Sequence, residues 1–415
     1  MYLGPEKLLE KRKEYIMPCL GNFYKDPPQF VRGEMQYLFD HEGKKYLDFF
    51  AGVSVMNCGH SNPAILEPVI TQLSSLQHTC NIYLTQPVAD LAEKLAHILP
   101  DGIESSFFCN SGSEAMDGAM VLARTITLKR KFISLVGGLH GRTSLTMSAT
   151  GIPMWRTDPF LTEDDFYFID INGDYEKSLK TLEDLLKLYG NSIAGFIAEP
   201  IQGNAGIITP PDWYFESVHE ILKSYDVLLI MDEVQTGFGR TGKMFACEHF
   251  DIIPDIIVYA KALGNGIPIA GFSTSKENAS LFTKPSASTL GGNPVSCTAG
   301  LAVIDYIERN DLIAKSDALG EYLYDALVRL KNKYVCIADV RGKGLMLGIE
   351  LVDCQCDPMA SEVDVILERL KDNGVIIGRN GMARNVLAFQ PPLVIGRDDI
   401  DFVIKELAAA LEIVS

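Results

Sequence analysis

Short apolar runs that end in polar residues mark the middle of the chain. One of them is Val-Leu-Leu-Ile-Met at 227–231, which two acids end at Asp232. A run this short that contains β-branched residues suits a strand buried on both faces of a parallel sheet. A second run, at 256–259, precedes Lys261 and a glycine-rich segment. We therefore predict that Asp232 and Lys261 lie at the carboxyl ends of two strands, where open α/β sheets bind their ligands.

The same pattern repeats upstream. Strand-like and helix-like patterns alternate from about residue 105 to 275, which predicts a doubly wound, parallel sheet. The residues that precede a helix at 175–189 are rich in proline and acids, and we interpret them as a linker. Because the carboxyl ends of parallel strands meet at one edge, polar clusters at those ends are expected to form one site. These clusters lie at 110–113, 139–142, 199–204 and 232–235.

The two ends of the chain predict a second unit. Apolar and polar positions alternate in 36–50 around a Glu-Gly pair, as in a β-hairpin. Toward the other end, helices are predicted around 316–333 and 361–373, with a short strand at 374–378. We expect three parts: residues 1–60 as the N-terminal part of a small domain, 61–310 as a large cofactor-binding domain, and 311–415 as the C-terminal part of the small domain.

Composition narrows the class of partner. The 415 residues carry a formal net charge of -17, which argues against nucleic acid and anionic membranes, since both attract clustered Lys and Arg. The longest apolar runs fall short of the roughly 18 residues of a membrane helix. The first residues mix acids with bases, unlike a secretory or transit segment, and the nine scattered cysteines suit reduced thiols. We expect a cytoplasmic protein without structural zinc or disulfides.

Lys261 and Asp232 together indicate one kind of chemistry. Burial lowers the pKa of a lysine, and the neutral amine condenses with an aldehyde. A carboxylate that keeps a pyridine nitrogen protonated turns the ring of that aldehyde into an electron sink. Taken singly, a lysine after a strand is more often a surface charge, and an aspartate there is more often a helix N-cap. The pair suggests pyridoxal phosphate because partners for the phosphate and the ring are also present.

The phosphate candidates are Ser111, Gly112 and Ser113. They open a helix directly after the strand predicted at 105–110. The first amides of a helix have no intrahelical partner and lie at the positive end of its dipole, so they bind anions. The alternative interpretation is an ordinary capping box, in which Ser111 pairs with a later glutamate.

Three further loops offer pocket residues. In the glycine-rich loop 137–142, Leu139 or His140 is placed to lie on a flat ring, although a lone histidine is more often an ordinary satisfied polar residue. The small-residue loop 51–60 either lines a pocket or forms a tight connection. A third loop, between two predicted helices, carries Tyr83.

Taken together, the motifs resemble those of the class III (ω-amino acid) aminotransferases. Their order and spacing match over nearly the whole chain, and the set is far more specific than any one member. The motifs are Glu-Pro-Ile-Gln-Gly at 199–203, Asp-Glu-Val-Gln-Thr-Gly-Phe-Gly-Arg at 232–240, Ala-Lys at 260–261, Thr-Leu-Gly-Gly-Asn-Pro at 289–294 and Val-Arg-Gly-Lys-Gly-Leu-Met-Leu-Gly-Ile-Glu at 340–350.

The resemblance implies a type I pyridoxal-phosphate transferase fold. This is an α/β fold with a doubly wound, mostly parallel sheet and a smaller α+β domain formed by the two chain ends. It further implies pyridoxal 5'-phosphate as the cofactor, ping-pong kinetics, and a homodimer or tetramer with active sites shared between subunits.

Roles follow position by position. Lys261 corresponds to the Schiff-base lysine and proton shuttle, and Asp232 to the partner of the pyridinium nitrogen. Gln235 corresponds to the hydrogen-bond partner of the ring hydroxyl, and Glu199 to the residue that orders the pocket beside it. Thr289 is expected to reach the phosphate of the partner subunit's cofactor. The remaining implied cofactor contacts are Ser111, Gly112, Ser113, Leu139, His140 and Val234.

Three positions depart from the family pattern. Leu139 stands where many members have an aromatic residue that stacks on the ring, which predicts looser cofactor binding, with His140 as the candidate to compensate. The ornithine and 4-aminobutyrate branches bind 2-oxoglutarate through an arginine three residues before a Pro-Pro pair, and a glutamate pairs with that arginine. Here the two positions hold Ala388 and Asn204. Alanine supplies no guanidinium for a carboxylate clamp.

Other arginines are available for an acceptor carboxylate. The segment that ends in Arg379 resembles the one in which amine:pyruvate and β-alanine:pyruvate enzymes carry a mobile arginine. Arg379 is therefore the first candidate and Arg384 the second, while a solvated loop arginine is the alternative interpretation. Val55 and Tyr83 complete the expected substrate site.

These features predict transfer of an amino group from an ω- or β-amino acid, or an amine, to pyruvate or glyoxylate. The contexts of two motifs also resemble alanine:glyoxylate aminotransferases of the second type. The alternatives are a 2-oxoglutarate-using member, or a racemase, aminomutase or phospho-lyase of the same fold. A nucleotide-binding α/β protein is disfavoured, because the chain has neither G-x-G-x-x-G after the first strand nor a G-x-x-x-x-G-K-[ST] loop.

Overall fold

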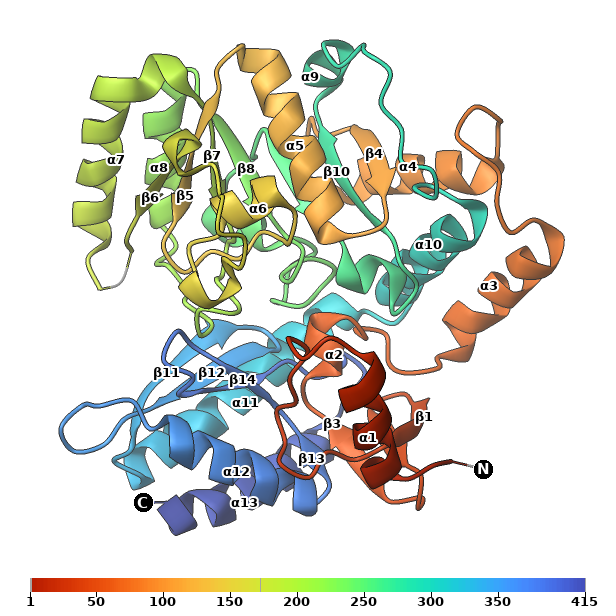
Figure 1. Cartoon of the computed structure of the whole chain (residues 1–415), viewed down its shortest axis with the longest axis vertical. Helices are drawn as coiled ribbons and strands as arrows, with labels where there is room; N and C mark the ends of the chain where they lie inside the picture. Colours follow the sequence, from red (N-terminus) through yellow and green to blue (C-terminus); the bar gives the residue numbers. More distant parts are fainter. Residues whose placement is uncertain (1, 172, 415) are drawn as a thin grey trace.

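A seven-stranded sheet forms the centre of the larger part of the molecule (Figure 1). The computed structural model describes residues 2–171 and 173–414. The strand order is β4-β10-β9-β8-β7-β5-β6; the five strands from β9 to β6 run parallel, and β10 is antiparallel to both neighbours. The predicted mostly parallel sheet is confirmed. The strands are β4 (Ser105–Cys109), β5 (Lys131–Leu135), β6 (Phe166–Ile169), β7 (Ile193–Ala198), β8 (Leu228–Asp232), β9 (Ile256–Tyr259) and β10 (Ala270–Thr274).

Helices cover both faces of this sheet. Alternate strand residues point to opposite faces, so Ile230 packs in a cluster with α5 whereas Leu229 and Met231 belong to the larger core on the other face. Figure 1 shows α5 lying across the sheet. The helices of this part are α3 (Pro63–Ser75), α4 (Gln86–Ile98), α5 (Gly112–Thr127), α6 (Ser144–Ala149), α7 (Tyr175–Tyr189), α8 (Tyr214–Lys223), α9 (Lys276–Ser280) and α10 (Pro294–Arg309).

The segment interpreted as a linker carries an edge strand, so that interpretation is wrong for part of it. β6 pairs with β5 alone, from Phe132 against Phe166 to Leu135 against Ile169. Its residues, Phe-Tyr-Phe-Ile, have the aromatic character of a strand. The surrounding prolines and acids concealed this signal.

Both chain ends build the smaller part. β3 pairs in parallel with β13, with Leu47 opposite Val375, so the two ends share one sheet. The short strand expected at 374–378 is in fact two strands, β13 and β14, which belong to different sheets. The first sheet contains β1 (Phe30–Glu34), β2 (Tyr37–Asp40), β3 (Lys45–Asp48) and β13 (Val375–Ile376), and the second β11 (Ile337–Lys343), β12 (Met346–Leu351), β15 (Val386–Phe389) and β14 (Gly378–Asn380).

Four longer helices accompany these sheets. They are α1 (Pro5–Tyr15), α11 (Leu312–Lys333), α12 (Ala360–Asp372) and α13 (Arg397–Val414), and a single turn, α2 (Ala51–Ser54), follows β3. An α+β unit made from both ends is as predicted, while the exact boundaries at 60/61 and 310/311 stay a prediction. Within the described ranges, no helix is both long enough and apolar enough to cross a bilayer.

Arg240 fastens the two parts together. Its side chain is fully buried, and its Nη1 donates to the carbonyl oxygens of Leu345, at 2.9 Å, and Pro391, at 2.6 Å. Its Nη2 donates to Oδ1 of Asn57 at 2.5 Å. One cation therefore joins the loop after β8 to segments from both chain ends, which sets the small part against the carboxyl edge of the large sheet.

Candidate active site

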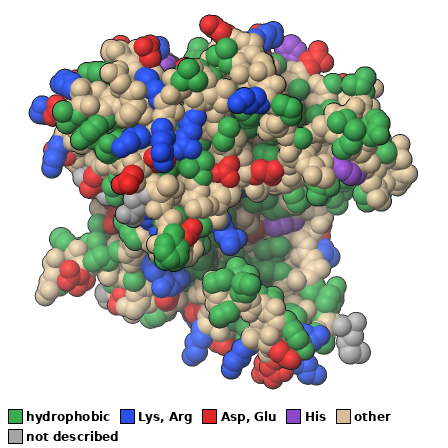
Figure 2. Space-filling model, turned by 45° about the horizontal axis from the view of Figure 1, so that its top comes forward, with side chains coloured by type: hydrophobic (Ala, Val, Ile, Leu, Met, Phe, Trp, Pro, Cys, Tyr) green, Lys and Arg blue, Asp and Glu red, His purple; other side chains and the backbone are tan. Residues whose placement is uncertain are grey.

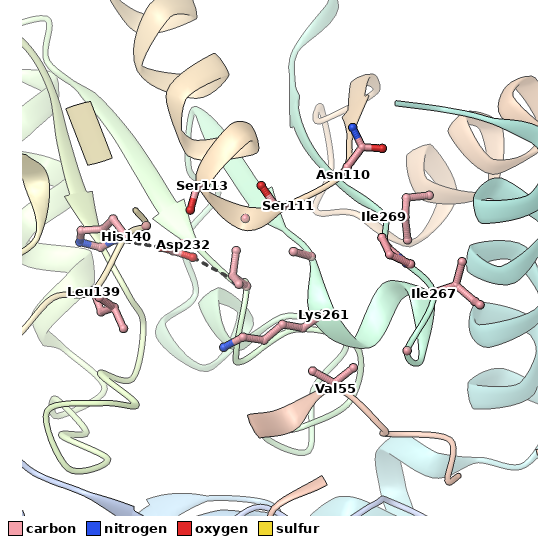
Figure 3. Close-up of a pocket in the computed structure, with 16 residues that line it drawn as sticks. Val55, Asn110, Ser111, Ser113, Leu139, His140, Asp232, Lys261, Ile267 and Ile269 are labelled. Atoms are coloured by element: carbon pink, nitrogen blue, oxygen red, sulfur yellow. Dashed lines mark hydrogen bonds and ion pairs between the residues drawn. The ribbon is translucent and has the colours of Figure 1, made fainter. Parts of the chain in front are cut away.

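Three of the four predicted polar clusters, 110–113, 139–142 and 232–235, line a cavity of about 360 Å³ at the carboxyl edge of the seven-stranded sheet (Figure 3), whereas no residue of 199–204 lines it. Figure 2 shows the surface hollowed between the larger and smaller parts. The predicted residues that line the cavity are Val55, Ser111, Gly112, Ser113, Leu139, His140, Asp232, Val234 and Lys261. The lining also includes seven residues that were not predicted from the sequence, namely Asn110, Gly141, Ala260, Gly266, Ile267, Pro268 and Ile269.

Asp232 ends β8 with its side chain in the cavity wall. Only 4% of the residue is exposed. Its Oδ1 accepts from the backbone N–H of Val234 at 3.1 Å, and its Oδ2 lies 2.8 Å from Nδ1 of His140. Nε2 of His140 is buried, and no described residue is its partner. Because a carboxylate oxygen accepts, Nδ1 of His140 is the donor in this contact. His140 therefore supports Asp232, and because it also lines the cavity, the ring contact considered in the sequence stays a prediction.

Lys261 follows β9 in the left-handed region, with φ of 44°. Figure 3 shows its amine extending into the open centre of the cavity. Burial lowers the pKa of this amine, and the nearby carboxylates of Glu199 and Asp232 oppose the shift. A lysine in this setting has a larger neutral fraction than a surface lysine, so it is the better nucleophile.

Glu199 organises two loops around the site. Its Oε1 accepts from the backbone N–H of Leu139 at 2.9 Å, and its Oε2 accepts from that of Gly203 at 3.0 Å. Burial raises the pKa of this carboxyl to about 7, with the Asp232 charge acting in the same direction and His140 and the two backbone donors opposing it. The loops after β5 and β7 are thereby held at one fixed separation.

The N-terminus of α5 faces the same cavity. Ser111 caps the helix by accepting from the N–H of Glu114 at 3.3 Å, but the Glu114 carboxylate accepts from the N–H of Asn110, so only the serine half of the expected capping box forms. Oγ of Ser113 accepts from the N–H of Arg142 at 3.0 Å. A Cβ added to Gly112 would lie 3.2 Å from Cγ1 of Val234, so a larger residue would crowd the cavity wall. The helix presents unpaired amides and a close backbone approach, which together suit a phosphate group.

The turn that carries Val55 has an unusual backbone. All four residues of α2 have positive φ, between 49° and 68°, and Val53 is β-branched. Such a left-handed turn costs roughly 1–2 kcal/mol for each residue other than glycine. Oδ1 of Asp48 accepts from the N–H groups of Phe50 and Ala51 and thereby holds the turn. The loop 51–60 is both a tight connection and a cavity wall.

Six predicted residues lie outside the cavity lining, namely Tyr83, Glu199, Gln235, Thr289, Arg379 and Arg384. Gln235 is buried close to the cavity, with 5% of the residue exposed. It contacts Gln390, which was not predicted from the sequence as a site residue. Tyr83 and Thr289 are exposed in loops of the large part. Ser288, beside Thr289, accepts through Oγ from Nδ2 of Asn110 at 2.9 Å, so this loop is attached to the cavity rim.

The arginines are placed differently from one another. Arg379 forms an ion pair with Asp364 of α12 and therefore lies on the helix-covered face of its sheet. Arg384 is exposed in the loop between β14 and β15, whose Gly381 donates to the carbonyl of Asn204. A third, Arg142, was not considered from the sequence; it directly follows the cavity residue Gly141 and is exposed.

Comparisons with known proteins agree with this geometry. The family model described as aminotransferase class-III matches residues 25–411. The chain belongs to this family. A relative named alanine–glyoxylate aminotransferase 2 homolog 2, mitochondrial, from Arabidopsis thaliana is 41% identical over 98% of this chain and 88% of its own length. The acetylornithine aminotransferase of Methanocaldococcus jannaschii is 35% identical over 98% of both chains.

A solved structure identifies the cofactor class. An amine transaminase from an uncultivated Pseudomonas species, in a form with pyridoxal phosphate bound, superimposes with a TM-score of 0.91 at 28% identity, covering 97% of this chain and 99% of that one. This class III aminotransferase thus has the type I fold and depends on pyridoxal phosphate. The cofactor supplies the aldehyde and the electron-withdrawing ring. The Asp232 carboxylate held by His140, the α5 N-terminus and the Lys261 amine provide matching groups for ring nitrogen, phosphate and aldehyde.

Proposed function

We propose that each cavity residue takes the role its chemistry suits. Lys261 binds the cofactor covalently through Nζ and, once released, carries the proton between the substrate carbon and the cofactor. Asp232, held by His140, keeps the ring nitrogen protonated. Gly112 and Ser113 hold the phosphate at the start of α5. The burial of Asp232 and its 2.8 Å contact with His140 support this assignment.

We further propose a short keto acid, pyruvate or glyoxylate, as the amino acceptor. The observation that carries this proposal is the setting of Ala388. Its methyl group packs in an apolar cluster with Ile201, Ile207 and Met346, at the position where other branches place the arginine of the 2-oxoglutarate clamp. A second carboxylate has no cation to meet there, and burying it against apolar groups is costly. Asn204 also lacks the charge to support such a cation.

The amino donor is proposed to be an ω- or β-amino acid or an amine. The resemblance of the motifs to the ω-amino acid aminotransferases supports such a donor, and the Arabidopsis relative, named for alanine and glyoxylate, supports the small acceptor. The archaeal relative is named for acetylornithine, which keeps a 2-oxoglutarate-using enzyme as the second candidate. The absence of the clamp residues favours the first.

The acceptor test follows one half-reaction. The purified protein is converted to the amino form of its cofactor, and pyruvate, glyoxylate or 2-oxoglutarate is then added separately while the visible absorption of the aldehyde form is recorded. We expect rapid return with the two small acids and at least about tenfold slower return with 2-oxoglutarate, since one unmade charged hydrogen-bond pair is worth about 1.5–3 kcal/mol. Equal rates would contradict the proposal, and no return with any acid would favour a racemase, aminomutase or phospho-lyase.

The same assay ranks the arginines as ligands of the acceptor carboxylate. Arg379→Ala, Arg384→Ala and Arg142→Ala are compared for the pyruvate concentration that gives half-maximal return. The residue that binds the carboxylate should raise this concentration by about 10- to 100-fold. Arg379 would have to leave Asp364 to act, so Asp364→Asn serves as its control: freeing the guanidinium should lower this concentration if Arg379 is the ligand.

A homodimer with shared sites is proposed from the surface around Tyr83 and Thr289. The loop between α3 and α4 exposes Ile82, Tyr83 and Leu84, and a Cβ on Gly292 would lie 3.8 Å from Oδ1 of Asn81, so the two loops are neighbours. Contiguous exposed apolar side chains of this kind mark association surfaces. A second copy seated here would bring Tyr83 and Thr289 toward the cavity of its partner.

Sedimentation measures the association. We expect a particle of at least twice the 45.7 kDa of the chain. Leu84→Asp should raise the dissociation constant at least about tenfold, since it places a charge in an apolar contact, and activity should fall in parallel with the loss of dimer. Leu188→Asp, at another exposed leucine on α7, is the control and should change neither. A fully active monomer would refute shared sites.

The cytoplasm is the proposed compartment. The five buried cysteines and the exposed Cys354 and Cys356 are all free thiols, as a reducing environment requires. A mitochondrial matrix is also reducing, and the Arabidopsis relative is named as mitochondrial. Fractionation of the source cells, with antibody detection, distinguishes the two.

A further inference from the structure

Two glutamine amides meet beside the cavity. Nε2 of Gln390 donates to Oε1 of Gln235 at 3.0 Å. Gln235 follows Asp232 in the loop after β8, whereas Gln390 follows β15 in the small part. Gln390 is fully buried and Gln235 is 5% exposed. The contact therefore links the two parts of the molecule through a pair of enclosed side chains.

Neighbouring groups hold Gln235 and Gln390 in place. A Cβ on Gly203 would lie 1.6 Å from Oε1 of Gln235, so the Gln235 amide lies flat against the backbone at this glycine. That backbone is itself held, because the N–H of Gly203 donates to Glu199 and its carbonyl accepts from Nδ2 of Asn380 at 2.9 Å. The N–H of Gln390 donates to the carbonyl of Phe49 at 2.8 Å. Packing thus fixes both side chains.

The contact also fixes which end of the Gln235 amide remains available. An amide has one oxygen that accepts and one NH2 group that donates. Since Oε1 of Gln235 already accepts from Gln390, its Nε2 is the end left to donate. Among the described residues nothing accepts from this nitrogen, and unlike Oε1 of Gln390 it is not sealed from solvent. Turning both amides over would leave the two donors of Gln390 buried and unpaired, which costs more than one unpaired oxygen.

We propose that Gln390 is a positioning residue that makes Gln235 a hydrogen-bond donor toward the ring oxygen of the cofactor. This inference rests on the proposed place of Gln235 beside that oxygen. A donor there stabilises the ionised oxygen, whereas an amide oxygen turned the other way would repel it. Gln390 sits directly before Pro391, whose carbonyl accepts from Arg240. The position of the small part therefore sets the orientation of the Gln235 amide through Gln390.

The readout is the pH at which the visible absorption of the cofactor-loaded protein changes. The proton that titrates is shared between the ring oxygen and the Lys261 nitrogen, and a donor at the oxygen makes it a poorer partner for that proton. Gln390→Leu removes the constraint on Gln235, so the midpoint should rise by about half a unit to one unit. Gln390→Met, equally apolar and more flexible, is the second variant if the leucine protein does not fold.

A double-mutant cycle separates positioning from general disturbance. Gln235→Leu should raise the midpoint on its own, and adding Gln390→Leu should then cause no further rise. An equal shift from Gln390→Leu in both backgrounds, or none in the wild-type background, overturns the inference while leaving the proposed role of Gln235 intact. An unchanged midpoint in Gln235→Leu, with the visible band present, overturns both.

Discussion

Replacing Lys261 with alanine is expected to lower turnover by about 10³-fold or more. The amine lies in the cavity, burial lowers its pKa, and the Glu199 and Asp232 carboxylates that act on it are each held by other partners. No other lysine lines the cavity formed by the described residues. The variant loses both the covalent attachment and the proton carrier, and acid–base catalysis alone is typically worth 10²–10⁴-fold.

The attachment is checked independently of turnover. Borohydride treatment should fix the cofactor to the wild-type protein through a reduced carbon–nitrogen bond that survives denaturation, whereas the Lys261→Ala protein should release its cofactor. Lys276→Ala is the control, because this exposed lysine pairs only with Glu104 in the described structure and should behave as wild type in both assays. Cofactor that stays attached to Lys261→Ala would assign the bond to another lysine.

The convergence of the strand ends was predictable from the sequence because it follows from chain connectivity. A short apolar run such as 227–231 is typical of a strand buried in a parallel sheet. Parallel strands place their carboxyl ends at one edge whatever their side chains are. Asp232, Lys261 and the start of α5 were therefore predicted to meet, and they line one cavity. The lining residues Ile267 and Ile269, which follow the glycine-rich segment after Lys261, were not predicted from the sequence.

Contacts between distant segments were not predictable in this way. In the sequence, Gln390 is an ordinary polar residue before a Pro-Pro pair. Its hydrogen bond with Gln235 depends on how the small part packs against the large part. In the sequence, Arg379 was the first candidate ligand for the acceptor carboxylate. In the folded chain it forms an ion pair with Asp364. The strand alternation that places Ala388 toward Ile201 and Ile207 sends Arg379 to the opposite face. That assignment required the register of β14 and β15, which no local pattern specified.

His140 shows the same limit at shorter range. Its position in a glycine-rich loop, next to Leu139, suggested a contact with a flat ring. The sequence does not show which way the imidazole points. The fold turns its Nδ1 toward Asp232 and leaves Nε2 buried. We therefore predict that the histidine acts on the cofactor through the carboxylate, and a contact with the ring stays a prediction. The structure makes Asp232 the centre of a buried hydrogen-bonded group rather than a lone acid at a strand end.

Asp232→Ala should therefore reduce turnover by about 10²–10³-fold, since removing one preorganised group that stabilises charge in a buried site typically costs that much in kcat. The substitution leaves both ring nitrogens of His140 without a described partner and takes away the charge opposite the ring nitrogen. The measurement is single-turnover kinetics with saturating donor. Glu233→Gln is the matched control: this neighbouring buried acid bonds to Thr236 and to the N–H of Cys247, so its loss should lower thermal stability with little effect on turnover.

A cofactor analogue methylated on the ring nitrogen separates the two possible causes of the Asp232→Ala defect. The methyl group fixes a positive charge on the ring, so the carboxylate is no longer needed to keep that nitrogen protonated. If Asp232 acts by holding the proton, the analogue should restore at least about tenfold of the lost rate in Asp232→Ala, equivalent to 1.4 kcal/mol. It should bring no gain to the wild-type protein, where the methyl group crowds the carboxylate. An equal defect with both cofactors would mean that Asp232 only shapes the cavity through His140 and the N–H of Val234.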